Sequence, residues 1–199
     1  MKIFLIRHGE KNRGLGDVGL SSLGREQSSL IANYLKYIGV ERLFSSKQKR
    51  AIETAEIIAY VLNKNFEVTD YLKERISFGE VHDQKYEDYI ELCKHSTINR
   101  NYVLPNGETS VHAGKRIEML IQSIPSSTKV VVFISHGGVI VDFLRNTFKE
   151  SELTQKLANF LKYYMVQYGS ITKIELVNNH FQLLSLGTVS HLTKSINTE

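Results

Sequence analysis

Residues 4–13 read FLIRHGEKNR, where a short apolar run ends directly on an arginine, a histidine, a glycine and a glutamate. The run KIFLI at residues 2–6 and a second run, KVVVFIS at residues 129–135, are short and continuously apolar. Both properties are typical of strands that are buried on two faces at the centre of a parallel sheet. The polar cluster of residues 7–10 therefore lies where a central strand ends.

Helical periodicity fills much of the sequence around these two runs. It covers residues 23–38, 51–62, 111–124 and 139–144, and a further strand is expected at RLFSS, residues 42–46. Alternation of strands and helices predicts an α/β fold, a three-layer α/β/α sandwich around a mostly parallel sheet. Near the C-terminus, two strand patterns joined by VNNH at residues 177–180 predict a hairpin that adds an antiparallel edge.

Residues 75–107 depart from this alternation. They hold a short amphipathic helical pattern (Tyr86, Tyr89, Ile90 and Cys93) that is flanked by polar loop. We expect one domain over residues 1–199, in which residues 75–107 form a lid or insertion over the active site at one end of the sheet.

Composition excludes several classes of protein. The net charge is +4, but the basic residues are scattered and no basic stretch is interleaved with aromatics, so we expect no nucleic-acid partner. The only cysteine, Cys93, excludes an intramolecular disulfide and a cysteine-rich metal cage. The apolar run at residues 3–6 is too short for a signal peptide, and no run approaches membrane-spanning length. We therefore expect a cytoplasmic protein that does not interact with membranes.

The residues just after the strands are the candidates for chemistry, because open α/β sheets bind ligands beyond the carboxyl ends of their strands. Arg7 and His8 follow the first strand, His136 follows the second, and Arg50 lies in the first turn of the helix after residues 42–46. A helix N-terminus beside two arginines favours an anion. Arginine matches phosphate oxygens in pairs, and a neutral imidazole can attack phosphorus. The sequence predicts that two imidazoles and two guanidiniums converge on a phosphate-like ligand.

Six segments, in order along the chain, resemble the motifs of the histidine phosphatase superfamily, which has the phosphoglycerate mutase-like fold. They are RHGE (7–10), LSSLGREQ (20–27), SSKQKRAIETA (45–55), LKER (72–75), PNGETSVHAGKR (105–116) and SHGGVI (135–140). The tail SLGTVSHL (185–192) is also similar to the segment that follows the last strand in this family. The resemblance implies a phosphatase, a hydrolase of phosphoric monoesters, that needs no cofactor.

The resemblance also implies roles for individual residues. His8 would be the nucleophile that forms a phosphohistidine intermediate. The residues that would bind the phosphoryl oxygens are Arg7, Arg50, His136 and Gly137.

Glu74 would be the general acid and then the base that activates water, by its place in LKER. Glu108 is the reserve for this role, and Glu80 and Asp83 are nearby competitors. Glu10 and Ser45 are accessory candidates: Glu10 to orient or screen the arginines, Ser45 to hold the loop or bind phosphate.

A metal site is disfavoured. The two histidines with Glu10 or Glu74 could ligate zinc, but the neighbouring arginines would repel a cation and no fixed third ligand is present. We expect no metal.

The expected substrate is a phosphorylated small molecule or a phosphoprotein. Residues 11–19 lack the W-N and G-W elements of phosphoglycerate mutases, and FGEV at residues 78–81 lacks the tryptophan common in small-molecule phosphatases. The missing mutase elements argue against reversible mutase activity, and mutase-type phosphotransfer is kept as an alternative to hydrolysis. A non-catalytic phospholigand-binding module is a second alternative, although binding alone requires neither a nucleophile nor an acid. The apolar stretch FLKYYMV at residues 160–166 could support a homodimer.

Overall fold

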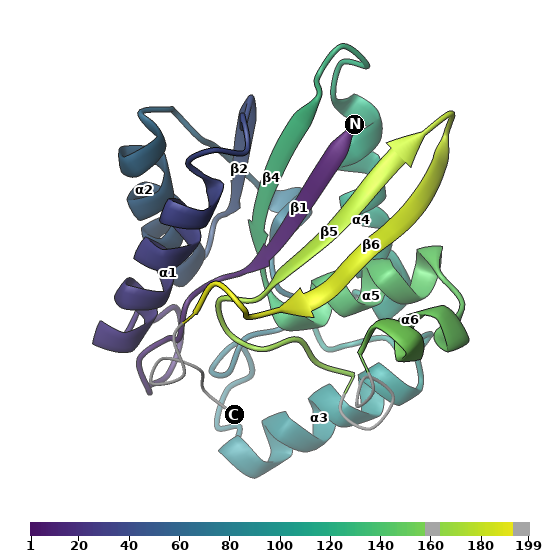
Figure 1. The fold of residues 1–199 in the computed structure, drawn as a ribbon. Coiled ribbons are helices and arrows are strands. Elements are labelled where there is room, and N and C mark those ends of the chain that lie inside the picture. The colour runs from purple at the N-terminus through teal and green to yellow at the C-terminus, as the bar shows by residue number, and fades with distance from the viewer. Residues whose placement is uncertain (158–163, 193–199) are drawn as a thin grey trace.

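A computed structural model describes residues 1–157 and 164–192. Within these residues the chain forms a six-stranded sheet in the order β3-β2-β4-β1-β5-β6 (Figure 1). The strands are β1 (Lys2–Arg7), β2 (Arg42–Ser46), β3 (Glu67–Thr69), β4 (Val130–Ser135), β5 (Ile171–Val177) and β6 (His180–Thr188). The strands expected at residues 2–6, 42–46 and 129–135 are confirmed. β3 is not anticipated by the sequence, because its three residues carry no apolar run.

The sheet is parallel at its centre and antiparallel at one edge. β1 and β2 both run parallel to β4, whereas β5 lies antiparallel beside β1 and β6 antiparallel beside β5. The turn between β5 and β6 has positive φ at both Asn178 and Asn179, a conformation that asparagine tolerates in tight hairpin turns. The predicted antiparallel hairpin at the edge is confirmed.

Helices cover both faces of the sheet. They are α1 (Ser22–Leu35), α2 (Lys49–Leu62), α3 (Tyr86–Ile98), α4 (Ser110–Ser123), α5 (Gly137–Thr147) and α6 (Glu150–Lys156), with a 3-10 turn, η1, at Asp70–Leu72. One buried cluster joins the sheet to α1 and α2, and a second joins it to α4 and α5. The predicted three-layer sandwich is confirmed.

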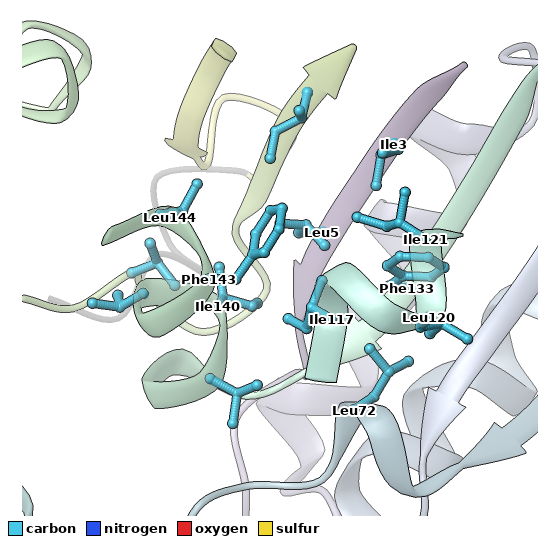
Figure 2. Close-up of a cluster of buried hydrophobic side chains, with 14 of the residues drawn as sticks. Ile3, Leu5, Leu72, Ile117, Leu120, Ile121, Phe133, Ile140, Phe143 and Leu144 are labelled. Atoms are coloured by element: carbon cyan, nitrogen blue, oxygen red, sulfur yellow. The ribbon is translucent and has the colours of Figure 1, made fainter. Parts of the chain in front are cut away.

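Alternate side chains of the central strands feed these two clusters. Ile3 and Leu5 of β1 pack with Phe133 of β4 against α4 and α5 (Figure 2). Phe4 and Ile6, the residues between them, face α1 and α2 instead. Because both faces of β1 are buried, its sequence is apolar at consecutive positions rather than at every second one. This packing fixes the point at which the strand ends and the polar residues begin.

Residues 75–107 hold α3 between two irregular segments. Arg75 ties the start of this region to α3, since its guanidinium donates to the hydroxyls of Ser96 and Thr97 at 3.3 and 3.0 Å. In Figure 1, α3 lies on the side of the sheet where β1 ends. That this region acts as a lid, within one domain spanning the chain, stays a prediction.

Two further expectations concern the proposed dimer contact and membrane-spanning helices. Most of FLKYYMV, the proposed dimer contact at residues 160–166, lies outside them because residues 158–163 are not described. Among the helices of residues 1–157 and 164–192, none has the length and apolar character needed to cross a membrane.

Candidate active site

The two predicted histidines lie side by side at the carboxyl ends of β1 and β4. The register of these strands sets Arg7 opposite Ser135, so the residues that follow, His8 and His136, occupy neighbouring positions. Their ring centroids are 5.0 Å apart with an interplanar angle of 62°. Both residues are buried, with 3% and 0% of their surface exposed. The strand register therefore brings together two imidazoles that are distant in sequence.

Two hydrogen bonds assign one tautomer to His8. Its Nδ1 lies 2.7 Å from the carbonyl oxygen of Gly9, which can only accept, so Nδ1 carries the proton. Its Nε2 accepts from Nε of Arg50 at 3.1 Å, and this bond requires an unprotonated nitrogen. The lone pair of Nε2 therefore faces the arginine cluster, as a nucleophilic nitrogen would.

A hydrogen-bonded chain holds His136. Its Nε2 lies 2.8 Å from Oγ of Ser46, and Ser46 in turn donates its hydroxyl proton to the side-chain oxygen of Gln48. This direction makes Nε2 of His136 the donor to Ser46. The other ring nitrogen, Nδ1, is buried without a hydrogen-bond partner within the described part of the chain. A buried polar atom of this kind indicates a binding position for a ligand.

Arg50 lies at the start of α2 and is partly neutralised by Asp17. The carboxylate of Asp17 accepts the backbone N–H of Lys49 at 2.9 and 3.0 Å and lies 3.5 Å from Nη1 of Arg50. Asp17 thus occupies the N-terminus of α2, where a negative charge is stabilised by the helix dipole. Asp17 was not predicted as a site residue, because it lies in an irregular loop outside the recognised motifs.

Arg7 is fixed from both sides. Its Nη1 donates to the carbonyl of Val166 at 2.6 Å, and its guanidinium carbon lies 3.7 Å from the ring centroid of Tyr168. A side chain at Gly137 would approach within 3.3 Å of the guanidinium, so glycine permits this packing. The Nε of Arg7 is buried and has no hydrogen-bond partner among the residues that the structure describes. The ring of Tyr168 also lies near that of His8, with centroids 5.5 Å apart and an interplanar angle of 51°, and the sequence did not predict this contact.

Burial and the arginines keep both imidazoles neutral. Burial lowers the pKa of His8 well below 6.5, and Arg50 and then Arg7 lower it further. The pKa of His136 is also well below 6.5, first because of burial and then because of Arg50, His8 and Arg7. The pKa of Arg7 is lowered by burial, with Tyr168 and Glu74 opposing the shift.

Two of the sequence motifs also support the loop that carries His8. A side chain at Gly9 would collide with the backbone of Gly24, and one at Gly24 would collide with the backbone of Glu10. The backbone N–H groups of Gly9 and Glu10 donate to Thr54 Oγ1 at 3.2 Å and to Gln27 Oε1 at 2.8 Å. The segments LSSLGREQ and RAIET therefore supply the close approach and the acceptors that hold this loop.

Glu74 lies beside the N-terminus of α5. A side chain at Gly138 would come within 2.8 Å of Glu74 Oε1, so the carboxylate is adjacent to the residues that follow His136. Glu74 is half-buried, and Oε1 accepts the backbone N–H of Arg75 at 2.9 Å. Its charge is close enough to Arg7 to raise the pKa of that guanidinium. The structure therefore brings Glu74 to the same end of the sheet as the histidines.

The three accessory candidates have other contacts. Glu10 Oε1 accepts a hydrogen bond from the hydroxyl of Ser21 at 2.7 Å. Ser45 Oγ donates to the carbonyl of Ser46 at 2.9 Å. Both carboxylate oxygens of Glu108 are bound by the guanidinium of Arg116, at 2.6 and 3.0 Å. Each of these three side chains is thus occupied by a protein partner.

A cavity of about 290 Å³ adjoins the site beside Arg50 and Ser46. It is lined by Gly16, Asp17, Lys47, Gln48, Ser77, Gly79 and Glu80. The ammonium of Lys47 lies 2.7 Å from the carboxylate of Asp70, so its charge is paired. The lining combines two glycines with charged and polar side chains, Asp17, Lys47, Gln48 and Glu80 among them. No group of three or more His, Cys, Asp or Glu in residues 1–157 and 164–192 is arranged to hold a metal ion.

Comparisons with known proteins converge on one family. The family model of the histidine phosphatase superfamily (branch 1) matches residues 3–189. A protein of Schizosaccharomyces pombe named a probable phosphatase is 29% identical over 215 residues, which cover 96% of this chain and 95% of the relative. Phosphoglycerate mutase-like protein 4 of Arabidopsis thaliana is 31% identical over 175 residues, which cover 79% of this chain and 76% of the relative.

A solved structure has the same fold. The phosphoserine phosphatase of Entamoeba histolytica, in complex with 3-phosphoglyceric acid, matches with a TM-score of 0.73 and 22% identity. The match covers 96% of this chain and 99% of that one. At this level of identity the similarity shows the fold alone.

We expect His8 and His136 to be neutral at pH 6 in the free protein. A histidine in water has a pKa of about 6.5 and is mostly protonated at that pH. Nitrogen-15 NMR of the imidazoles, assigned with single histidine substitutions, should show His8 as the Nδ1–H tautomer. Since the unfolded chain takes up these protons and the folded chain does not, the free energy of unfolding should fall as the pH drops below about 6.5. An imidazolium signal from His8 at pH 6 would contradict the assignment.

Proposed function

The chain belongs to the histidine phosphatase superfamily (branch 1) and is a phosphatase, and from this premise we propose that it hydrolyses phosphomonoesters through a phosphohistidine at His8. The observation that carries the proposal is the state of the His8 ring. The bond from Nδ1 to Gly9 holds the proton on one nitrogen, and the other nitrogen keeps its lone pair among arginines. A neutral, oriented imidazole is the form of histidine that can act as a nucleophile.

The phosphoryl group binds between the two imidazoles and the two arginines. The unpartnered Nε of Arg7 would donate to a phosphoryl oxygen. The unpartnered Nδ1 of His136, which carries no proton in the tautomer described above, would accept from a protonated oxygen of the phosphate monoanion. Arg50 exchanges its bond to Nε2 of His8 for one to the phosphoryl oxygens, which leaves Nε2 free to attack. Fixed positive charge stabilises the transferring phosphoryl group without reorganisation during the reaction.

The reaction proceeds in two displacements. In the first, Nε2 of His8 forms a bond to phosphorus while the bond from phosphorus to the leaving oxygen breaks, and Glu74 gives its proton to that oxygen. In the second, Glu74 takes a proton from water, the water oxygen bonds to phosphorus, and the bond between nitrogen and phosphorus breaks. The cycle returns inorganic phosphate, a neutral His8 and a protonated Glu74. One carboxyl group serves as acid and then as base.

The acid role falls to Glu74 rather than Glu108 because of their contacts. Both oxygens of Glu108 are held by Arg116, so this carboxylate has no free oxygen to present to a leaving group. Glu74 has one oxygen on the N–H of Arg75 and lies beside Gly138, next to His136.

The substrate is a phosphorylated small molecule. The cavity of about 290 Å³ beside Arg50 accommodates a leaving group of modest size, and its lining of Asp17, Gln48 and Glu80 is polar. The related Entamoeba structure contains 3-phosphoglyceric acid, a ligand of this kind. Hydrolysis is distinguished from mutase-type transfer by supplying 3-phosphoglycerate and measuring released phosphate against formation of the 2-isomer.

Replacing the nucleophile should abolish turnover. We expect His8→Ala to lower hydrolysis of p-nitrophenyl phosphate by at least about 10³-fold, because no other group can form the covalent intermediate. The wild type should retain its activity in the presence of a chelator, and acid-labile phosphate should be trapped on the wild type but not on the variant.

His180→Ala is the matched control, since His180 is exposed at the start of β6, in the edge hairpin. It should keep wild-type activity. Substantial turnover by a folded His8→Ala protein would exclude the proposed intermediate, and binding of phosphate by a wild type without turnover would identify a binding module.

Replacing the acid should affect substrates according to their leaving group. We expect Glu74→Gln to slow hydrolysis of an alkyl phosphate by about 10²-fold or more, because an alkoxide leaves poorly without a proton. p-Nitrophenyl phosphate should change by less than about tenfold, since p-nitrophenolate needs no acid. Glu80→Gln, which alters a carboxylate of the cavity wall, is the control and should not show this pattern. If Glu80→Gln shows it instead, the acid role belongs to Glu80.

A further inference from the structure

We propose that Glu108 and Arg116 are positioning residues for proton transfer, and that their ion pair holds the backbone turn that presents Glu74. The inference deepens the proposed function and rests on it, because it concerns the group that protonates the leaving oxygen. It gives a role to the segment PNGETSVHAGKR, residues 105–116, whose carboxylate does not reach the histidines by any contact described above.

The guanidinium of Arg116 binds both the backbone turn that precedes Glu74 and the carboxylate of Glu108. Nη1 donates to the carbonyls of Asp70 and Tyr71 at 3.1 and 2.8 Å, and Nη2 donates to the carbonyl of Lys73 at 2.9 Å. The remaining donors bind Glu108, with Nε to Oε1 at 2.6 Å and Nη2 to Oε2 at 3.0 Å. Lys73 immediately precedes Glu74, so the last of these carbonyl bonds is one residue from the proposed acid.

The other carbonyls around Glu74 are also bound by side chains. Ser135 Oγ donates to the carbonyl of Leu72 at 2.8 Å, and Asn106 Nδ2 donates to the carbonyl of Arg75. From residue 70 to residue 75, every carbonyl except that of Glu74 itself therefore accepts from a side-chain donor. Asp70–Leu72 form only the short turn η1, and residues 73–75 lie in no strand or helix, so side-chain donors hold this segment.

A second arginine holds the chain on the far side of Glu74. Nε of Arg75 lies 3.1 Å from a carboxylate oxygen of Asp142, and the same guanidinium bonds the hydroxyls of Ser96, Thr97 and Ser110. Arg75 and Asp142 are 6% and 0% exposed. Arg116 and Arg75 thus anchor the residues just before and just after Glu74.

The ion pair with Glu108 makes this arrangement stable. Arg116 and Glu108 have only 14% and 13% of their side chains exposed, so an uncompensated guanidinium there would be poorly solvated. Glu108 neutralises the charge and fixes the plane of the guanidinium, while the remaining N–H groups bind carbonyls. General acid catalysis requires the carboxyl group within hydrogen-bond distance of the leaving oxygen, and a displacement of about 1 Å can cost about 10²-fold in rate.

The test compares two leaving groups in a double-mutant cycle. Arg116→Lys keeps the charge but loses the planar fork, so it should slow hydrolysis of an alkyl phosphate by about tenfold and that of p-nitrophenyl phosphate by less than about twofold. In a Glu74→Gln background, Arg116→Lys should have no further effect on the alkyl phosphate, because the group that it positions is absent. Glu108→Gln should produce the same pattern.

Arg42→Lys is the matched control, since Arg42 pairs with Glu67 at 2.5 Å at the start of β2, the end of that strand away from the histidines. It should leave both rates unchanged. Circular dichroism and thermal melting establish that each variant is folded, and Glu108→Gln decides the question if Arg116→Lys does not fold.

Several results would overturn the inference. An equal loss with both substrates would indicate a general structural role, as would an effect of Arg116→Lys that persists in the Glu74→Gln background. Unchanged rates in Arg116→Lys would show that the turn is held without it. If the proposed function is wrong, the results differ: the effect of Glu74→Gln on the rate would then not depend on the leaving group. The inference would then fail as well, because it requires Glu74 to be the acid.

Discussion

The structure depends on one constraint, the burial of two neutral imidazoles and two guanidiniums close together at the end of the sheet where β1 and β4 end. Arg7 and Arg50 lower the pKa of His8 beyond the effect of burial alone. Nε of Arg7 and Nδ1 of His136 are left without hydrogen-bond partners in the described chain. Burial of unpaired polar atoms costs free energy, and a bound tetrahedral anion would recover it. The same arrangement supports the proposed binding of a phosphoryl group at this site.

The sheet imposes this arrangement through register. Arg7 lies opposite Ser135, and Ser45 lies opposite Ile134, so the ends of β1, β4 and β2 are level. His8, His136 and Ser46 consequently meet without any long side chain reaching across the molecule. The backbone bond from His8 N to the carbonyl of Ser135, at 3.0 Å, continues the pairing of β1 with β4 beyond the last paired residues.

The convergence of Arg7, His8 and His136 could be predicted from the sequence, because these residues lie at the ends of strands. Continuous apolar runs located β1 and β4, and the residues after them were the ones that converge. Tyr168 could not be predicted, because its contact with Arg7 arises only when the chain before β5 passes the end of β1, where Gly169 N bonds the carbonyl of His8 at 3.1 Å. The pair of Glu108 and Arg116 was visible only as a motif. The role that we propose for this ion pair depends on the backbone carbonyls of residues 70–73, and no local sequence pattern specifies the conformation of that turn.

The most direct test of the shared anion site is a crystal structure of the wild type with orthovanadate, an analogue of the transferring phosphoryl group. The account predicts vanadium bonded to Nε2 of His8, with the vanadate oxygens at hydrogen-bond distance, about 2.7–3.0 Å, from Arg7, Arg50 and Nδ1 of His136. The bond between Arg50 and His8 should be broken in that complex. Vanadate bound elsewhere, with Arg50 still on Nε2 and the two imidazoles facing no common ion, would contradict the account.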